Sequence, residues 1–471
     1  MIAIVVSRAD YASEHIGDHL LELADWEEHQ DDTRPDADGG GTVYRTDGFE
    51  LRTFEDLHVY LDDPTNAFVS GGTDQTPGTD ADPDLLVFAS RHSGETGALL
   101  TAHFTGNFGP EKYGGSDREL AETCPGAQKA VVSALAEHAP DGYEVGIEAT
   151  HHGPTKLSVP SMFVELGSDD PQWEDAEAAR AVARAILDLR GTSVNLEAAG
   201  GDDSDDTDNG DPNRHVVGFG GGHYAPRFGR VVRETEWAVG HVGANWQLDA
   251  MGAPETNHDV LEQAFEQSDA EFALVDGENP ELEAVIDELG YEVVSETWLR
   301  EVGDRPLPVV SALEAELSTV DDGLRFGRRR VDDESGFSVV EFPDELLAET
   351  QGIDADAVRE AVLDHTVAFE TQESGTRAVG RAAVAGDTDY GALVAALTDV
   401  LESKYDEVER DEGSGVVRAH ESAFDPERAK TLGISEGPAF GKLAAGQAVE
   451  REGERIDPEV VHVDRTVTFP Y

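Results

Sequence analysis

Residues 85–109 read LLVFASRHSGETGALLTAHFTGNFG, which is the pattern of a buried strand that runs into a polar loop. The apolar run LLVFA is followed by Ser90, Arg91 and His92 and then by a loop that contains glycine. A short apolar run closed by Gly, Ser or His residues is typical of a buried strand. Open α/β sheets bind their ligands at the carboxyl ends of such strands. We therefore expect a functional loop after residue 90.

Two further segments repeat this arrangement. They read EATHHGPTKLSVPSMFVELGS (148–168) and HVVGFGGGHYAPRFG (215–229). If all three loops leave strands of one sheet, then His92, His151, His152 and His223 meet at one edge. Imidazoles gathered in this way favour a metal or acid/base site over a structural core.

The rest of the first 300 residues alternates between strand and helix patterns. Strands are predicted at 2–6, 85–90, 144–149, 162–166, 215–219, 237–242 and 272–275, and helices near 11–25, 126–138, 173–190, 256–267 and 280–289. This alternation predicts an α/β fold with a mostly parallel or mixed sheet and helices on both faces.

Changes in composition along the chain predict two domains. Residues 1–300 form the α/β catalytic domain, and residues 301–471 form a smaller accessory module, helix-rich near 343–403 with a short β-rich tail. Stretches rich in Asp, Gly, Thr or Pro are predicted to be solvated surface insertions. They lie at 29–41, 70–84 and 197–213 and in the neighbourhood of 318–336.

The charge of the chain is extreme. It has 471 residues, with 99 Asp and Glu against 34 Lys and Arg, a formal net charge of −65 and a pI near 4.3. Such a balance suits a halophilic cytoplasm, because at molar salt the Debye length is about 3 Å and self-repulsion is screened. An acidic disordered protein is a poor alternative, since 39% of the residues are hydrophobic and their runs are periodic.

Several classes of protein are excluded by composition. A single cysteine, Cys124, excludes an intramolecular disulfide and a cysteine-rich zinc site, so that any metal must use histidine and carboxylate ligands. No apolar stretch approaches the roughly 18 residues of a membrane span. The amino terminus MIAIVVSRAD lacks the positive region of a signal peptide. We expect a cytoplasmic protein without membrane partners, and a monomer is compatible with the sequence.

The strongest candidate ligands lie in the second segment. Glu148, His151 and His152 place three metal-competent side chains within five residues, and a Gly-Pro turn lets both imidazoles face one cavity. Alternatively, one ring of the pair only hydrogen-bonds the turn. His103 is either a further ligand or a satisfied polar residue. Glu165 is a candidate metal ligand or general base.

Arg91 and the glycines at 220–222 are candidates for binding an anion. Arg91 can bind a phosphate or carboxylate in bidentate fashion, or it can form a salt bridge to a nearby acid. Gly220, Gly221 and Gly222 offer backbone N–H groups as an oxyanion cradle. This run lacks the third glycine and the downstream acid of a dinucleotide fingerprint, so no dinucleotide cofactor is expected.

The motifs SRHSGE, LTAHFTGN, EATHHGPT, MFVELGS and VGFGGGHYAPRF together resemble the archaeal and plant type of D-aminoacyl-tRNA deacylase, the second family of D-tyrosyl-tRNA deacylases. The tail motif EGPAFGKLAAGQAV is also similar to that family. The resemblance implies a fold related to phosphorylases and peptidyl-tRNA hydrolases, zinc dependence, and hydrolysis of the ester between a D-amino acid and tRNA as chirality proofreading. The acidic loops and residues 300–420 exceed the compact archaeal form.

Zinc-activated water is the chemistry that fits both the residues and the resemblance. The candidate metal ligands are His92, His103, Glu148, His151, His152 and His223, and the candidate catalytic residues are His92, His151, His152, Glu165 and His223. A tRNA partner of so acidic a chain requires a local basic patch. Arg91, Arg227, Arg230 and Arg233 are the candidates.

Two other functions fit the same residues. One is a nucleoside phosphorylase or another small-molecule metallohydrolase on a similar sheet. The other is a non-catalytic binding module in which the histidines hold a structural zinc ion.

Overall fold

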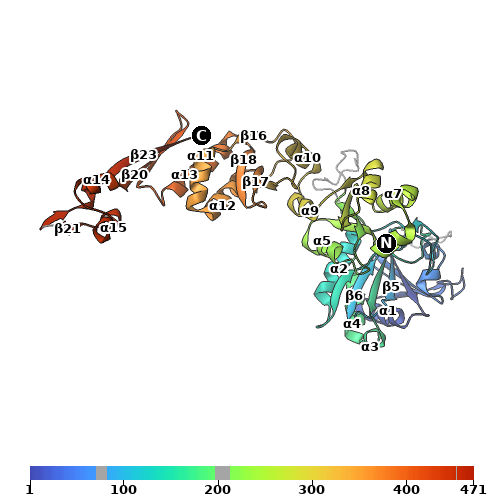
Figure 1. The fold of residues 1–471 in the computed structure, drawn as a ribbon. Helices are drawn as coiled ribbons and strands as arrows, with labels where there is room; N and C mark the ends of the chain where they lie inside the picture. The colour runs from blue at the N-terminus through green and yellow to red at the C-terminus, as the bar shows by residue number, and fades with distance from the viewer. Residues whose placement is uncertain (70–81, 197–212, 452) are drawn as a thin grey trace. The chain divides into compact units, whose positions relative to one another are not determined.

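The computed structural model describes residues 1–69, 82–196, 213–451 and 453–471 (Figure 1). The chain divides into two compact units, Met1–Asp304 and Arg305–Tyr471. Within the part of the chain that the structure describes, no helix is both long and apolar enough to cross a membrane.

The first unit is built on an eight-stranded sheet with the order β2-β3-β4-β1-β5-β10-β6-β9. Its strands are β1 (Ile2–Ser7), β2 (Glu27–Asp31), β3 (Gly41–Thr46), β4 (Phe49–Phe54), β5 (Leu85–Arg91), β6 (Leu99–His103), β9 (Glu144–Ile147) and β10 (Ser161–Gly167). The central strands β4, β1, β5 and β10 run parallel, and the sequences of β1 and β5 are almost wholly apolar because both faces of the sheet are covered. β6 runs antiparallel to β10.

Helices cover one face of this sheet. They are α1 (Tyr11–Leu23), α2 (Pro125–His138) and α4 (Ala176–Leu187), with the short α3 (Asp170–Trp173) before α4. α1 begins at Asp10, whose carboxylate accepts hydrogen bonds from the N–H groups of Ala12 and Ser13, as an N-cap does. Gly17 brings this helix close to β1, since a Cβ there would lie 3.1 Å from the Val6 side chain.

The opposite face of the sheet carries a second apolar cluster. The rings of Phe88 and Phe163 stack with centroids 4.5 Å apart. The short helix η2 (Pro64–Ala67) contributes Ala67 to this cluster, and Leu157 and Val159 pack against it. Burial of such side chains from both faces fixes the register of the strands.

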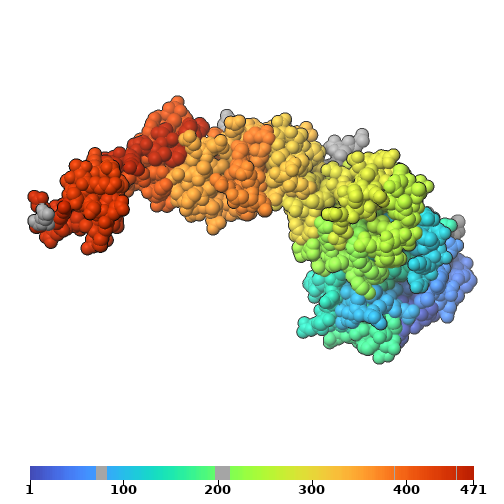
Figure 2. Space-filling view, viewed as in Figure 1, coloured from blue at the N-terminus to red at the C-terminus, as the bar shows by residue number. Residues whose placement is uncertain are grey.

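A second, four-stranded parallel sheet completes the first unit, in the order β12-β11-β13-β14. Its elements are β11 (His215–Gly220), α5 (Pro226–Glu234), β12 (Ala238–Gly243), α6 (Asn245–Met251), α7 (His258–Glu266), β13 (Phe272–Asp276), α8 (Pro280–Glu288), β14 (Glu292–Val293) and α9 (Glu296–Val302). α2 contacts β6 and β9 of the first sheet and β12 of the second, and so joins them. In Figure 2 the blue, cyan and green segments of this unit form one closely packed body.

The predicted α/β class, with a mixed and largely parallel sheet, is confirmed. One local prediction differs from the structure. The segment 29–41, interpreted as a solvated insertion, supplies the end of β2 and the first residue of β3. β2 reads EEHQD and lies at the sheet edge, where polar side chains on an exposed strand leave no apolar signal. The insertions predicted at 70–84 and 197–213 fall mostly outside the described residues.

The second unit contains smaller, antiparallel sheets. A four-stranded sheet has the order β15-β17-β18-β16, and a three-stranded sheet has the order β19-β20-β23. Their strands are β15 (Leu324–Phe326), β16 (Ser338–Glu341), β17 (Ala368–Gln372), β18 (Arg377–Val384), β19 (Glu407–Asp411), β20 (Val416–Phe424) and β23 (His462–Pro470). The region 343–403, predicted to be helix-rich, therefore also contains the hairpin β17–β18.

Three helices, α11 (Asp344–Ile353), α12 (Ala355–His365) and α13 (Asp387–Leu401), pack on these sheets. The unit also contains α10 (Leu307–Glu316), α14 (Pro426–Thr431) and α15 (Pro438–Ala444). The core of this unit includes Leu346, Val362, Leu393 and Leu397, all fully buried. A short hairpin of β21 (Val449–Arg451) and β22 (Glu454–Ile456) packs near the end of the chain.

Candidate functional site

Histidines and glutamates from five places in the first unit meet in one buried cluster. His92 follows β5, His103 ends β6, Glu165 lies on β10, and His223 follows β11. The turn that carries Glu148, His151 and His152 follows β9. This turn joins the two sheets, because Ala149 N donates to His223 O (2.7 Å) and Thr150 N donates to Val242 O (2.9 Å).

The prediction that the site residues meet at one edge of a sheet accounts for only part of this cluster. His92 and His223 follow the carboxyl ends of parallel strands, as expected. His103 and Glu165 instead lie on strands. Because β6 runs antiparallel to β10, His103 is paired with Phe163 rather than with the end of β10. The cluster therefore extends over one face of the sheet.

Two buried carboxylates connect the imidazoles. Glu148 Oε2 lies 2.7 Å from His223 Nε2 and 4.0 Å from His151 Nε2, and its Oε1 lies 3.2 Å from His92 Nδ1. Glu165 lies 3.7 Å from His92 Nδ1 and 3.5 Å from His103 Nε2. Glu148 is 2% exposed and Glu165 3% exposed, so neither carboxylate is hydrated as a surface group would be.

Three of the imidazoles are held in the same tautomer. His103 Nδ1 lies 3.0 Å from Phe104 O, His151 Nδ1 lies 2.8 Å from Ala149 O, and His152 Nδ1 lies 2.7 Å from Gly153 O. A carbonyl only accepts, so each Nδ1 carries the proton and donates it. Nε2 is therefore the atom that each ring offers to a metal, because in the neutral ring it has the lone pair through which histidine binds one.

These three rings are also close enough to share one ion. One ligand atom of each of His103, His151 and His152 lies within 4.8 Å of the others. Two further groups, Glu148 with His151 and His223, and His92 with Glu148 and Glu165, satisfy the same distance. Within the described part of this cluster, His103 Nε2 and Glu148 Oε1 are buried and form no hydrogen bond of good geometry, although each lies in an ion pair with Glu165 and His92, respectively. Buried polar atoms of this kind call for a ligand.

The backbone of the turn is strained at one of these ligands. His152 has φ of +48°, a left-handed conformation that is uncommon for residues other than glycine. The turn is held by hydrogen bonds from Gly106 N to His152 O (2.9 Å) and from Gly153 N to Tyr113 O (3.1 Å). Strain of about 1–3 kcal/mol at such a residue persists where the surroundings fix it, and it is common at functional sites.

The carboxylates are anionic. Burial raises the pKa of Glu148, but hydrogen bonds from His223 and His92 outweigh burial and hold that pKa well below its ordinary value. Burial likewise raises the pKa of Glu165, and His103 and His92 bring it below the ordinary value. Both groups therefore accept protons or coordinate cations at neutral pH.

The histidines divide into two kinds. Burial lowers the pKa of His92, yet its hydrogen bonds to Glu148 and Glu165 raise the pKa to about 10, and Glu165 raises the pKa of His103 against burial in the same way. Burial and the neighbouring His103 lower the pKa of His152 to about 4, and they lower that of His151 as well. The site thus holds two imidazoles with lowered pKa values beside two with raised pKa values.

The comparisons with known proteins agree on one family. The family model for D-aminoacyl-tRNA deacylase matches residues 79–294. A D-aminoacyl-tRNA deacylase of Halorubrum lacusprofundi is 60% identical over 100% of this chain and 97% of its own length. The chain belongs to the D-aminoacyl-tRNA deacylase family. It is accordingly an enzyme of this kind, which hydrolyses the ester bond of aminoacyl-tRNA, and the resemblance in its motifs is confirmed.

Other relatives extend the match to the whole deacylase. The D-aminoacyl-tRNA deacylase of Natronomonas pharaonis is 52% identical over 100% of both chains. The crystal structure of a conserved protein of unknown function, AF0625, is 29% identical, with a TM-score of 0.52, and covers 64% of this chain and 96% of its own. The second unit of the deacylase is therefore shared with its full-length relatives.

Two of the three glycines predicted to bind anions, and the predicted arginine, have structural partners in this deacylase, whereas a Cβ at Gly222 would meet open space. Gly220 and Gly221 have φ of +98° and +71°, and a Cβ at either position would lie within 2.7 Å of an oxygen of Asp276. The guanidinium of Arg91 lies 5.2 Å from the centre of the Trp173 ring, and its backbone N donates to Asp10 Oδ2 (3.0 Å).

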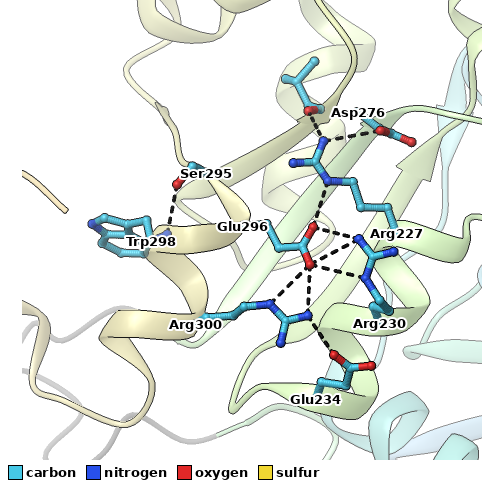
Figure 3. Close-up of polar contacts among 9 residues, drawn as sticks. Arg227, Arg230, Glu234, Asp276, Ser295, Glu296, Trp298 and Arg300 are labelled. Atoms are coloured by element: carbon cyan, nitrogen blue, oxygen red, sulfur yellow. Dashed lines mark hydrogen bonds and ion pairs between the residues drawn. The ribbon is translucent and has the colours of Figure 1, made fainter. Parts of the chain in front are cut away.

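The other arginines proposed for a phosphate-binding patch are also occupied (Figure 3). Glu296 accepts hydrogen bonds from Arg227 Nε (3.1 Å), Arg230 Nη2 (3.0 Å) and Arg300 Nη2 (2.9 Å). Although burial opposes the shift, these guanidinium groups lower the pKa of Glu296 to about 2. Arg233 donates to Val145 O (2.8 Å). Arg227 and Arg230 thus join α5 to Glu296 of α9, and Arg233 joins α5 to β9.

Sequence reasoning missed two aromatic residues beside the cluster. Tyr224 OH lies 3.3 Å from His92 Nε2, and burial raises the pKa of this hydroxyl, which therefore stays protonated. The ring of Trp246 lies 6.5 Å from that of His223. Tyr224 could have been predicted as a site residue because it directly follows His223. Trp246 has no predicted site residue next to it in the sequence.

Proposed function

We propose that the chain hydrolyses the ester of D-aminoacyl-tRNA with water activated at a zinc ion held by His103, His151 and His152. The observation that carries this proposal is the shared orientation of the three rings. In each ring Nδ1 donates a hydrogen bond to a backbone carbonyl, so that Nε2 is the atom offered to a metal. Three protein ligands and one open position are the arrangement of catalytic zinc. Zinc in such a site lowers the pKa of bound water to about 7 and polarises the ester carbonyl.

The carboxylates supply the proton transfers. Glu148 and Glu165 are anionic and buried, so each is able to take a proton from the attacking water. His92, with its pKa raised to about 10, donates a hydrogen bond to the oxyanion that develops at the carbonyl. His92 is held in place by both carboxylates and by Tyr224 OH.

His223 is the candidate general acid for the leaving ribose oxygen. Its side chain is 30% exposed, whereas those of His92 and His103 are 5% and 0% exposed, so it lies toward the solvent side of the cluster. Its Nε2 lies 2.7 Å from Glu148 Oε2, and this hydrogen bond orients the ring. A proton given to the ribose oxygen releases the tRNA, and water reprotonates the ring.

The experiment uses the full-length chain in molar KCl with D-tyrosyl-tRNA and L-tyrosyl-tRNA. We expect release of D-tyrosine, slow decay of the L-ester, one equivalent of bound zinc by mass spectrometry of the metal, and loss of activity with a chelator that added zinc restores. Full activity of a preparation from which the metal has been removed would overturn the zinc proposal. Equal hydrolysis of both esters would contradict selectivity for the D-amino acid.

A further inference from the structure

We propose that Trp246 and Lys112 form a binding site for the terminal nucleotide of the tRNA, in which the base stacks on the indole of Trp246 and Lys112 contacts the phosphate. This inference deepens the function proposed above and rests on it for the identity of the substrate. It concerns the positioning of the substrate, and neither residue takes part in the chemical step.

Trp246 is unusually exposed for a tryptophan. It lies on α6 and is 43% exposed, whereas Trp237 and Trp298 of the same unit are 0% and 7% exposed. Its ring lies 6.5 Å from the ring of His223, and the ammonium group of Lys112 lies over it. The packing of the fold thus leaves much of this indole open to solvent, and an exposed aromatic face is a surface on which a base stacks.

Lys112 lies over this indole, with Nζ 5.8 Å from the ring centre. Its side chain is exposed, and no carboxylate of the described residues lies within ion-pair distance of it. This is notable in a chain with 99 acidic and 34 basic residues, where Arg227, Arg230 and Arg300 are all paired. A cation without an acidic partner is able to bind a phosphate at little cost.

The loop that carries Lys112 is fixed to the catalytic cluster. Gly153 N, directly after His152, donates to Tyr113 O (3.1 Å). A Cβ at Gly153 would lie 2.2 Å from the backbone N of Gly115, so the turn and the loop pack closely. Lys112 and Trp246 are thus neighbours that are both tied to the histidines, Lys112 through this loop and Trp246 through His223.

The arrangement matches the chemistry of the substrate. One ribose separates the ester of an aminoacyl-tRNA from its terminal base, so the base must lie close to the reacting carbonyl. His223 is both a member of the cluster and a neighbour of Trp246, so the indole lies within that reach. Stacking is little affected by salt, unlike phosphate contacts, and so it suits an acidic enzyme that works at high ionic strength.

The first experiment compares three D-tyrosyl esters, those of tRNA, adenosine and methanol, with the wild-type chain, Trp246→Ala and Trp246→Phe in molar KCl. Stacking of one base corresponds to about 5- to 150-fold in affinity. We expect the ratio of kcat/KM for the adenosine ester to that for the methyl ester to fall about tenfold in Trp246→Ala, mainly through KM. Trp246→Phe restores most of this ratio. An unchanged ratio would overturn the proposal.

The second experiment does not depend on hydrolysis. Calorimetry with AMP gives a Kd that we expect to be about tenfold weaker for Trp246→Ala than for the wild type and Trp246→Phe. Equal Kd values for all three proteins exclude this nucleotide site even if the wild type hydrolyses D-tyrosyl-tRNA. Loss of hydrolysis with AMP binding intact instead contradicts the proposed function and leaves the nucleotide site standing.

Lys112→Ala tests the phosphate contact. We expect a KM for D-tyrosyl-tRNA about threefold higher, and a weaker dependence of KM on KCl concentration than in the wild type. The matched control is Arg184→Ala, which removes an exposed cation on α4 that also lacks an acidic partner among the described residues. Equal effects of the two substitutions would show a general effect of charge and would contradict a role for Lys112.

Discussion

Glu148 and Glu296 are each surrounded by three nitrogen-containing side chains, but of different kinds. Glu148 lies 2.7, 3.2 and 4.0 Å from His223, His92 and His151. Glu296 lies 3.1, 3.0 and 2.9 Å from Arg227, Arg230 and Arg300 (Figure 3). Both carboxylates have lowered pKa values. Similar geometry therefore does not by itself distinguish a functional carboxylate from a structural one.

The partners make the distinction. An imidazole gains and loses a proton near neutral pH and binds metals through its lone pair. A guanidinium group remains charged and only donates hydrogen bonds. The cluster around Glu148 is thus able to move protons and hold an ion, whereas the cluster around Glu296 is a fixed ionic contact between α5 and α9. The following substitutions test this contrast.

His152→Asn should have the largest effect. Asparagine tolerates the left-handed backbone at this position but lacks Nε2, so the turn is retained and a ligand is lost. We expect kcat/KM for D-tyrosyl-tRNA to fall on the order of 10³-fold, with unchanged circular dichroism and less than half of the wild-type zinc. A variant that keeps a tenth of the activity would show that His152 is not a ligand.

Glu148→Gln should have the second largest effect. Glutamine keeps the shape of the side chain but not the charge that orients His92 and His223. We expect kcat/KM to fall about 100-fold while the free energy of unfolding changes by less than about 1 kcal/mol, because the imidazoles released from the carboxylate can lose their protons. Chemical denaturation and initial rates check both values. A variant that is destabilised but fully active would show that Glu148 supports the fold and not the reaction.

The fold class and the members of the cluster could be predicted from sequence because both rest on local signals. LLVFAS and MFVELG are apolar runs of strand length, and they form β5 and β10. His92, His151, His152 and His223 stand in loops directly after strands. An apolar run of strand length predicts a buried strand, and polar residues in the loop after it predict a functional site.

The remaining features depend on pairing that no local pattern encodes. LLTAH gives the same signal whether β6 runs parallel or antiparallel to β10, yet its direction decides which residue His103 faces. The tautomers of the histidines depend on carbonyls that only the folded turn supplies. The sequence predicts a phosphate site at Arg227 and Arg230 because it does not show that they pair with Glu296, which lies more than 60 residues further along the chain.

His241 extends the contrast to a buried histidine whose ring contacts a backbone carbonyl and a hydroxyl group instead of a carboxylate. Its Nε2 donates to Ala121 O (2.8 Å), and its Nδ1 lies 3.0 Å from Thr150 Oγ1. Burial lowers the pKa of His241 to about 3. The unfolded chain therefore binds a proton below about pH 6.5 that the folded chain does not, so stability falls as the pH falls.

We expect this histidine to lower the free energy of unfolding by about 2 kcal/mol between about pH 7 and pH 5. His241→Gln keeps a donor toward Ala121 O and removes the titrating group, so its unfolding free energy should depend less steeply on pH. Denaturation at fixed KCl over this range measures the two slopes. Parallel slopes would show that His241 does not carry the effect.

Glu296→Gln should have the smallest effect and the opposite character to Glu148→Gln. Removal of the charge leaves Arg227, Arg230 and Arg300 close together without their shared partner, and their guanidinium groups cannot lose protons to relieve the repulsion. We expect the free energy of unfolding to fall by about 1–2 kcal/mol, since the contact is partly exposed, while kcat/KM stays within about twofold of the wild type. The loss should shrink as KCl is raised, because salt screens the repulsion. Glu234→Gln is the matched control, since the Glu234 side chain is 48% exposed and forms an ion pair with Arg300 at 2.8 Å. This substitution should lower the free energy of unfolding by only about a few tenths of a kcal/mol. If Glu296→Gln instead abolished hydrolysis in a stable protein, the fixed ionic contact would belong to the catalytic machinery and the division between the two carboxylates would fail.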